Sequence, residues 1–390
     1  MEQFARHQGA DAPSPAAVLI VDHLDEQFPL APLDDFLIHQ TPDPIRVAYS
    51  TDPRFFERYW NVFHDETGDL MLAIGGSFYP NLNKAESYAI VNHRGRQKSV
   101  RAFRALGVDR TQLTVGPIRP RIVEGLRSWH HGLDEGEWGF SYELDWTDTH
   151  RQIYDASYGS LSSGTPAGGQ RQVTAGFEGF GVVSGWIAVD GVRVEWPSGA
   201  ARGTRDRHWG IGRAVGGPAL NDGRPVRAGW KGGVWISFDD VAFWGNRVLY
   251  GFDDTRPGAS RIVAVQRRMR FEPDTKIFLE GIIEFTLAGG QKREIHVERL
   301  GFQTAYMRCG FYGGTPEDGL HHGEYSGPDR VEFDEYDVTR PEVRSRLSAL
   351  NEHHCRVTYE GRTTTGILQP LEPEAYESCL RNDPGWSLLG

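Results

Sequence analysis

The segment Trp186-Ile187-Ala188-Val189-Asp190-Gly191-Val192-Arg193-Val194-Glu195-Trp196 decides the fold class that we predict for this chain. Apolar and polar residues alternate on both sides of Asp190-Gly191. Because both turn residues of a tight hairpin need positive φ, Asp-Gly between two alternating runs predicts two antiparallel strands. Glu360-Gly361 predicts another hairpin, between Cys355–Tyr359 and Thr363–Leu368.

Short runs typical of strands recur outside these hairpins. Trp138–Trp146 alternates so that its aromatic and apolar residues share one face. Other such runs occupy residues 69–74, 87–91, 112–115, 234–238, 241–252, 261–271, 277–285 and 294–300. The convincing helix pattern is Pro341–Asn351, because proline suits a first turn and Leu347 and Leu350 share a face. Many short strands with few helices predict an all-β fold of barrels or curved sandwiches.

The composition limits the class of protein. Hydrophobic residues make up 39% of the 390 residues, which suffices for folded cores, and this length favours two domains. The formal charge of −11 argues against a nucleic-acid or anionic-membrane partner. The three cysteines are odd in number and far apart, which favours a reducing compartment over a disulfide framework. Without a recognisable signal peptide or a long apolar run, we expect a cytoplasmic protein that does not insert stably into a membrane.

We predict three parts along the chain: an irregular arm at residues 1–45, an N-terminal domain at 46–197 and a C-terminal domain at 198–390. The stretch Gly203-Thr204-Arg205-Asp206-Arg207-His208-Trp209-Gly210 lies near the joint. Its charges make it a poor core strand and a candidate for the wall of a site. The structural alternative is an Arg–Asp ion pair with a tryptophan that locks the two domains together.

No nucleotide-binding or hydrolase motif occurs in the sequence. Neither a GxGxxG nor a Walker spacing stands between a strand and a helix, and no GxSxG or HExxH pattern is present. Histidines combine with acids or cysteine in His296-x-Glu298, His321-His322-x-Glu324 and His353-His354-Cys355, but none has the spacing of a zinc site. We therefore predict no cofactor and no metal.

The motifs at Gly185–Gly191 and Arg205–Arg213 resemble a bacterial family of two-domain, lipocalin-like proteins. That family is related to hydroxyneurosporene synthase, the carotenoid 1,2-hydratase, and its midpoint motif runs Arg-Asp-His-Ser-Trp-Gly. The resemblance covers most of the chain from about residue 50 onward. It continues at Tyr79-Pro80-Asn81, Val115-Gly116-Pro117, Phe177-Glu178, His321–Pro328 and Leu350–Tyr359.

The resemblance implies two lipocalin-like β-barrels, or curved sandwiches, packed face to face around a central cavity. It implies a hydrophobic terpenoid, steroid or polyketide substrate and cofactor-free chemistry on its alkenes. Asp206 and Trp209 match the family's motif, and the pair would supply an acid and a cation-stabilising ring. Arg207 stands where the family has His, and His208 follows one place later. On a strand, this shift turns the imidazole to the opposite face.

Alkene hydration needs a carboxylic acid that stays protonated, an aromatic face for the cation and a base. Asp206 is the first candidate acid, although Arg205 or Arg207 beside it would lower its pKa. Glu178 is the second, on a predicted strand between two glycines that allow close approach of a ligand or of backbone. The alternative for Glu178 is a solvent-facing strand end.

The remaining candidates come from the second half of the chain. A glycine-rich loop brings together His322, Glu324 and Tyr325, which suits acid–base work or a solvated loop. Tyr250 falls where the hydratase relatives carry a Tyr-x-Asp element. We predict catalytic roles for Asp206, Glu178, His322 and His208, and substrate-binding roles for Arg205, Trp209, Tyr250, Glu324 and Tyr325.

Three function classes follow from these patterns. The first is a hydratase, dehydratase, isomerase or cyclase that acts on a hydrophobic small molecule at the domain interface. The second is a lipocalin-like carrier or sensor without chemistry. The third is a glycan-active protein, which the 11 tryptophans and many carboxylates suggest. The resemblance favours the enzyme over the carrier, and the sequence leaves a monomer or a homodimer open.

Overall fold

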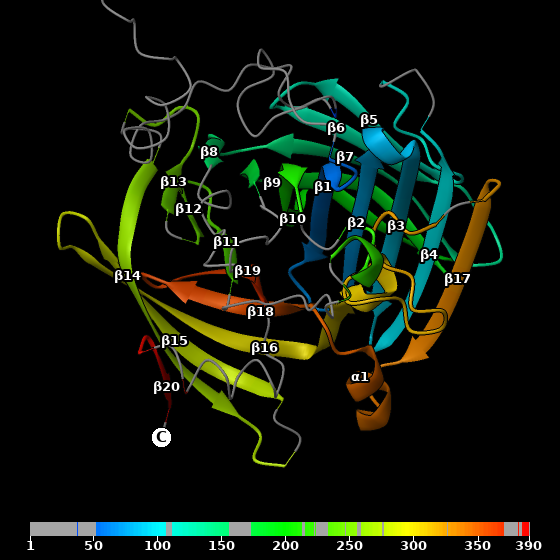
Figure 1. Ribbon diagram of the computed structural model, residues 1–390. Helices are drawn as coiled ribbons and strands as arrows, with labels where there is room; N and C mark the ends of the chain where they lie inside the picture. Colours follow the sequence, from blue (N-terminus) through cyan, green and yellow to red (C-terminus); the bar gives the residue numbers. More distant parts are fainter. Residues whose placement is uncertain are drawn as a thin grey trace, which may run out of the picture.

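The structure is a computed structural model that describes residues 37, 52–106, 111–155, 173–212, 215–221, 223, 233–245, 247–255, 259–274, 277–325, 327–369, 381 and 384–389. These residues form mostly β-structure, in two sheets that lie side by side (Figure 1). The predicted all-β fold class is confirmed.

The first sheet has the strand order β17-β4-β3-β2-β1-β10-β9-β7-β6-β5, and β8 pairs with β9. All of its pairings are antiparallel. Its strands are β1 (Phe55–Asp65), β2 (Leu70–Tyr79), β3 (Lys84–His93), β4 (Arg96–Ala105), β5 (Ile118–Glu124), β6 (Ser128–Leu133), β7 (Phe140–Asp148), β8 (Ile153–Asp155), β9 (Val173–Val189), β10 (Val192–Ile211) and β17 (Arg330–Asp337).

The second sheet has the order β13-β12-β11-β19-β18-β16-β15-β14, and an additional pairing of β13 with β14 closes it into an eight-stranded barrel. Strand β20 (Trp386–Leu388) adds to β14 in parallel. The barrel strands are β11 (Gly233–Ser237), β12 (Val241–Trp244), β13 (Arg247–Tyr250), β14 (Ala259–Phe271), β15 (Phe278–Leu287), β16 (Lys292–Tyr306), β18 (Asn351–Tyr359) and β19 (Arg362–Gln369). Helix α1 (Pro341–Leu347) and the short 3₁₀ turns Pro80–Leu82, Pro218–Leu220 and Met307–Gly310 complete the described elements.

Both predicted hairpins are present. Asp190 and Gly191 have φ of 52° and 77° between β9 and β10, and Glu360 and Gly361 repeat this pattern between β18 and β19. Three other elements differ from prediction. The run 241–252 is split into β12 and β13 by a turn in which Gly245 has φ 50°, the run 112–115 holds only an isolated bridge, and helix α1 ends at Leu347 because β18 begins at Asn351.

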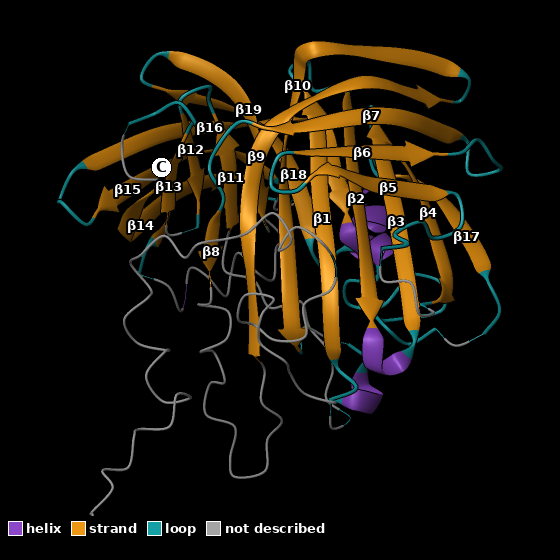
Figure 2. Cartoon of the chain, turned by 90° about the horizontal axis from the view of Figure 1, so that it is seen from above, coloured by secondary structure: helices purple, strands orange, loops and turns teal. Residues whose placement is uncertain are grey.

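Each sheet surrounds a hydrophobic core of its own. The first sheet folds over so that β5–β7 run across β1–β4 (Figure 2). The space between these strands is filled by apolar side chains, including Phe140, Tyr142, Leu144 and Trp146 on the predicted face of β7. The barrel encloses a second core, with Phe243 stacked on Phe285 at 5.1 Å between ring centroids.

A third cluster of buried side chains lies between the two sheets and combines Trp60, Val62 and Tyr88 of the first sheet with Trp235 and Ile367 of the barrel. The rings of Trp60 and Trp235 are 5.7 Å apart. This layer brings the outer face of the first sheet against the barrel, and it positions the candidate site.

The first sheet contains residues from both of the predicted domains. The expected boundary at residues 197 and 198 falls within β10, which pairs with β1 as far as Ile211, and β17 from the later half joins the first sheet. The division into domains stays a prediction. The expected arm at 1–45 lies outside the described residues except for Leu37, which is buried in the first core. Among described residues, no helix has the length and apolar character to cross a membrane.

Candidate functional site

Three neighbouring strands of the first sheet place two predicted site residues, Asp206 and Glu178, in one row with Trp60. Trp60 of β1 pairs with Asp206 of β10, and Asp206 pairs with Glu178 of β9. Residues directly opposite each other in a sheet share a face. His208 follows Asp206 by two positions and therefore lies on the same face. This face is the one that meets the barrel, because Trp60 contacts Trp235 of β11.

The side chains of this row make direct contacts. His208 Nδ1 lies 3.1 Å from Asp206 Oδ2, and His208 Nε2 lies 3.9 Å from Glu178 Oε1. The indole Nε1–H of Trp235 donates a hydrogen bond of 2.9 Å to Glu178 Oε2. The barrel therefore contributes a donor that fixes one carboxylate of the first sheet.

Burial differs among these groups in a way that matters for chemistry. The side chains of Glu178 and His208 are 1% and 2% exposed, whereas that of Asp206 is 13% exposed. Low water content strengthens electrostatic interactions among buried groups. Contact between a carboxylate and Nδ1 fixes the orientation of an imidazole and leaves Nε2 to exchange a proton. Asp206 is the member of the group that solvent or a ligand reaches most easily.

Tyr88 extends this group along the sheet. It pairs with Gly75, which pairs with Trp60. A Cβ at Gly75 would lie 2.3 Å from Tyr88 Oη, so the absence of a side chain there lets the tyrosine lie across β2. Burial raises the pKa of Tyr88 well above its ordinary value, and the nearby charge of Asp206 adds to this effect. Tyr88 is therefore a neutral phenol beside the site.

A second glycine makes room for His208. A Cβ at Gly176 of β9 would lie 2.2 Å from the carbonyl oxygen of Arg207 and 2.3 Å from His208 Cδ2. The expected close approach at the glycines beside Glu178 is thus present, and the groups that approach are backbone and a neighbouring side chain.

We expect Gly176→Ala to lower the free energy of unfolding by about 3 kcal/mol or more, because neither the backbone oxygen nor the buried ring can move away cheaply. Gly289→Ala is the matched control, since nothing lies within 4 Å of a Cβ built there. Urea unfolding midpoints of both variants measure the difference. Equal stability of the two variants would contradict this account of His208.

Three residues of the predicted motif lie on the other face of β10. Arg205 pairs with the buried carboxylate of Asp148 at 2.6 Å, and Arg207 with that of Glu57 at 3.4 Å. Trp209 packs near Tyr154 and Phe177 in a separate cluster. The structure does not bring Trp209 or Arg205 to Asp206.

His322 is held in a different group on the same face of the first sheet. Its Nδ1 lies 2.7 Å from Glu86 Oε1, while Tyr79 and the backbone N–H of Gly323 donate to the same carboxylate. Burial raises the pKa of Glu86 to about 7. Arg58 separates the two groups: it pairs with His208 across β1 and β10 and donates to Ser77 beside Glu86.

The other predicted site residues make their contacts with side chains and backbone other than Asp206. Glu324 accepts from the backbone N–H of His321 at 2.7 Å, and Tyr325 packs on Phe103 with 4.3 Å between ring centroids. Tyr250 belongs to the barrel core, where its hydroxyl contacts that of Ser260 at 3.0 Å. The structure brings together Asp206, Glu178 and His208, and it does not bring Tyr250 to them.

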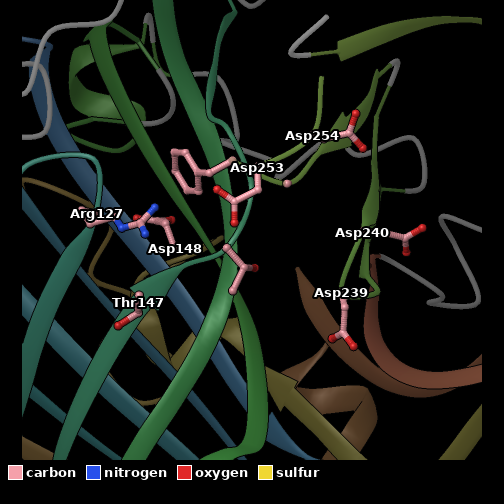
Figure 3. A pocket seen from close by; sticks show the side chains of 10 residues that line it. Arg127, Thr147, Asp148, Asp239, Asp240, Asp253 and Asp254 are labelled. Atoms are coloured by element: carbon pink, nitrogen blue, oxygen red, sulfur yellow. The ribbon is translucent and has the colours of Figure 1, made fainter. Parts of the chain in front are cut away.

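A pocket of about 540 Å³ lies elsewhere, between the end of β7 and two turns of the second half of the chain (Figure 3). None of the predicted site residues lines it, but Asp148, the partner of Arg205, does. The residues around it are Arg127, Thr147, Asp148, Thr149, Asp239, Asp240, Gly251, Phe252, Asp253 and Asp254. Three of its acids are already paired with arginines: Asp148 with Arg205, Asp239 with Arg202 and Asp240 with Arg362.

Among the described residues, one group of three acidic or histidine side chains is close enough to share a metal ion. Its ligand atoms come from Glu178, Asp206 and His208 and lie within 4.8 Å of one another. The same atoms could instead exchange protons, since Trp235 already binds one oxygen of Glu178 and His208 contacts Asp206. An acid–base group and a metal site are both chemically compatible with this arrangement.

A family model provides the first comparison with known proteins. Residues 30–259 match a family of unknown function, DUF8625. The chain belongs to this family. The matched region contains Asp206, Glu178 and His208.

No curated protein matches the chain in sequence. Solved structures with a similar arrangement include an AttH-like protein of Nitrosomonas europaea, which has 13% identity, a TM-score of 0.42 and coverage of 82% of this chain and 93% of its own. Kievitone hydratase of Nectria haematococca has 10% identity, a TM-score of 0.38 and coverage of 86% and 97%. CghA has 12% identity, a TM-score of 0.42 and coverage of 88% and 96%.

Sequence reasoning missed Trp60, Tyr88 and Trp235, which surround the predicted acids. Each lies on a strand far from Asp206 in the chain, and its place depends on strand pairing. The signal that could have found Tyr88 is Gly75-Gly76 within an apolar strand, because glycine inside a strand marks close approach.

Proposed function

We propose that this chain is a cofactor-independent enzyme that performs acid–base chemistry on a hydrophobic terpenoid, steroid or polyketide-like molecule. The reaction class is hydration or dehydration of an alkene, isomerisation or cyclisation. Under acid–base catalysis, each of these reactions includes a proton transfer to or from carbon and a cationic or enol-like intermediate.

One observation carries the proposal: the 3.1 Å contact between Asp206 and His208 lies in a buried layer beside two indole rings. The carboxylate–imidazole pair exchanges a proton, and Glu178, held by Trp235, orients water or the second proton. The faces of Trp60 and Trp235 stabilise a developing cation, by roughly 0.5–2 kcal/mol for each contact. An apolar substrate suits the surrounding layer, because Val62, Ala73 and Ile90 belong to it.

The test uses deuterium uptake from solvent. A panel of isoprenoid and polycyclic alkenes and tertiary alcohols is incubated with the protein in D₂O, and mass spectrometry records incorporation into carbon. We expect Asp206→Asn to lower incorporation at least about a hundredfold, since general acid–base groups contribute roughly 10²–10⁴-fold to rate. Binding, measured by quenching of tryptophan fluorescence, should remain.

The same experiment separates the alternatives. Incorporation at the wild-type rate in Asp206→Asn would remove the Asp206–His208 pair from the reaction. Binding of panel compounds without incorporation by the wild-type protein would favour the carrier or sensor. Loss of incorporation after treatment with EDTA, with recovery on adding a divalent cation, would assign Glu178, Asp206 and His208 to a metal instead.

A further inference from the structure

Glu352 is a buried carboxyl of the barrel that faces the first sheet. Cys355 and Val357 of β18 point into the barrel core, so Glu352 and His354 lie on the opposite face of this strand. The ring of His354 packs on that of His64 in β1 at 4.7 Å, which shows that this face meets the first sheet. The side chain of Glu352 is fully buried.

The contacts of Glu352 leave one of its oxygens available. Gln369 of the neighbouring β19 donates a hydrogen bond to Oε1. Oε2 is buried and has no hydrogen-bond partner among the described residues. No cation is paired with Glu352 among those residues. Burial raises the pKa of Glu352 and the amide hydrogen bond lowers it, and burial has the larger effect.

Glu352 and Asp206 belong to the two surfaces that meet in the layer between the sheets. Gln369 shares the barrel face that carries Trp235, because Ile367 pairs with Trp235 and Gln369 follows Ile367 by two positions. Trp235 contacts Trp60, and Trp60 pairs with Asp206. Burial raises the pKa of Glu352 well above its ordinary value, and the charge of Asp206 raises it further. Asp206 differs in its surroundings, because it is partly exposed and contacts the imidazole of His208. Two carboxyls in such different environments suit different roles, one as a proton donor and the other as a proton acceptor.

We infer that Glu352 is the proton donor of the site, with Gln369 as the residue that positions it and the Asp206–His208 pair as the acceptor. This inference rests on the proposed function and names the acid that the proposed function leaves open. The donor thus comes from one sheet and the acceptor from the other.

The step balances as a hydration. The Glu352 O–H bond breaks, and the π electrons of the alkene form a C–H bond to that proton, which leaves a carbocation and the Glu352 carboxylate. Water forms a C–O bond with the cation and gives one proton to the Asp206–His208 pair. Glu352 recovers a proton from water, and the pair returns its proton to water, so the net change is addition of one water molecule.

Glu178 is less suited to donate the proton. It accepts a hydrogen bond from Trp235, and this contact favours its ionised form. The merely structural alternative for Glu352 is a buried Glu–Gln hydrogen bond that joins β18 to β19. The following measurements separate these roles.

The first measurement needs no substrate. Infrared spectra of the whole protein at pH 7 report the carbonyl stretch of protonated carboxylic acids, and Glu352→Gln should remove one such band that Glu86→Gln leaves in place. Asp206→Asn should lower the pH at which the Glu352 band disappears. A spectrum of Glu352→Gln identical to that of the wild type would overturn the inference, and so would a band that does not respond to Asp206→Asn.

The second measurement uses the deuterium panel described above. Glu352→Gln should lower incorporation at least a hundredfold with unchanged binding, and Glu352→Asp should recover part of the loss. Gln369→Met, which retains Glu352 but removes its hydrogen bond, should give a smaller loss. If Glu352→Gln fails to fold, the infrared response to Asp206→Asn and the Gln369→Met rate still decide the role.

The outcomes distinguish the two proposals. Loss of incorporation in Asp206→Asn with wild-type incorporation in Glu352→Gln would overturn the role of Glu352 and keep the proposed function. Absence of incorporation by the wild-type protein would overturn the proposed function and, with it, the donor role, even if the infrared band shows that Glu352 is protonated beside Asp206.

Discussion

Lowering the pH from 7.5 to 5 should destabilise this protein strongly, because several histidines are buried in their neutral form. Burial lowers the pKa of His131, His353 and His354 to about 3 and that of His150 to about 4. It also lowers the pKa of His64 well below its ordinary value. None of these side chains is more than 8% exposed.

The direction of this pH effect on stability follows from proton binding. An unfolded histidine has a pKa near 6.5, so the unfolded chain binds more protons than the folded chain as the pH falls below this value. The stability is complete above about pH 6.5 and is lost as the pH falls toward the folded pKa. At pH 5 each such histidine lowers the free energy of unfolding by about 2 kcal/mol, whereas the whole free energy of unfolding of a typical protein is about 5–15 kcal/mol. Glu86 acts in the opposite direction, since its pKa of about 7 is raised, and it offsets part of the loss.

His131→Phe tests this account at one position. The imidazole stacks on Trp129 and meets the edge of Phe63, and neither of its nitrogens has a hydrogen-bond partner among the described residues. Phenylalanine should fit there. The difference in free energy of unfolding between the variant and the wild type should be about 2 kcal/mol more favourable to the variant at pH 5 than at pH 7.5. The exposed His296→Phe should show no such difference. Urea titrations at several pH values measure it, and parallel pH profiles of His131→Phe and wild type would refute it.

Local patterns in the sequence predict the hairpins and strand faces of this fold well. Asp190-Gly191 and the alternation in Trp138–Trp146 depend on turn geometry and a two-residue period, and neither needs distant partners. The run 241–252 is predicted as one strand, but Gly245-Asn246-Arg247 interrupts its apolar residues, and the turn at Gly245 divides it into two strands. The closure of the barrel through β13 and β14 depends on pairing that no local pattern contains.

At the candidate site, strand periodicity predicts which residues share a face within one segment, but it does not predict which distant residues pack against them. Asp206 and Trp209 are three residues apart, so on a strand they must lie on opposite faces, whereas Asp206 and His208 must share one. The period alone would have separated Trp209 from the acid and joined His208 to it. Trp235, in contrast, reaches the site only through packing of the barrel against the first sheet. Its position is not contained in any short segment around Asp206.

Replacing Asp148 with alanine should destabilise the protein by about 3–5 kcal/mol, because removal of one partner leaves a buried charge without compensation. The carboxylate of Asp148 is 0% exposed, and Arg205 at 1% donates to it from both Nε and Nη2. Asp148→Asn should also cost several kcal/mol, since an amide keeps the shape but not the charge. The exposed pair of Arg270 and Glu280 provides the control, and Glu280→Ala should cost less than about 1 kcal/mol.

The combination of Asp148→Leu with Arg205→Met separates charge from packing. Exchange of a buried ion pair for apolar residues of similar volume is often neutral or stabilising, so the double variant should lie within about 2 kcal/mol of the wild type. Arg205 lies over the rings of Trp129 and Phe177, and methionine retains part of this contact. Unfolding by urea measures all four variants. A double variant as unstable as Asp148→Ala would mean that the arginine acts through packing at this position, and a stable Asp148→Ala would mean that water reaches Arg205 through the pocket that Asp148 lines.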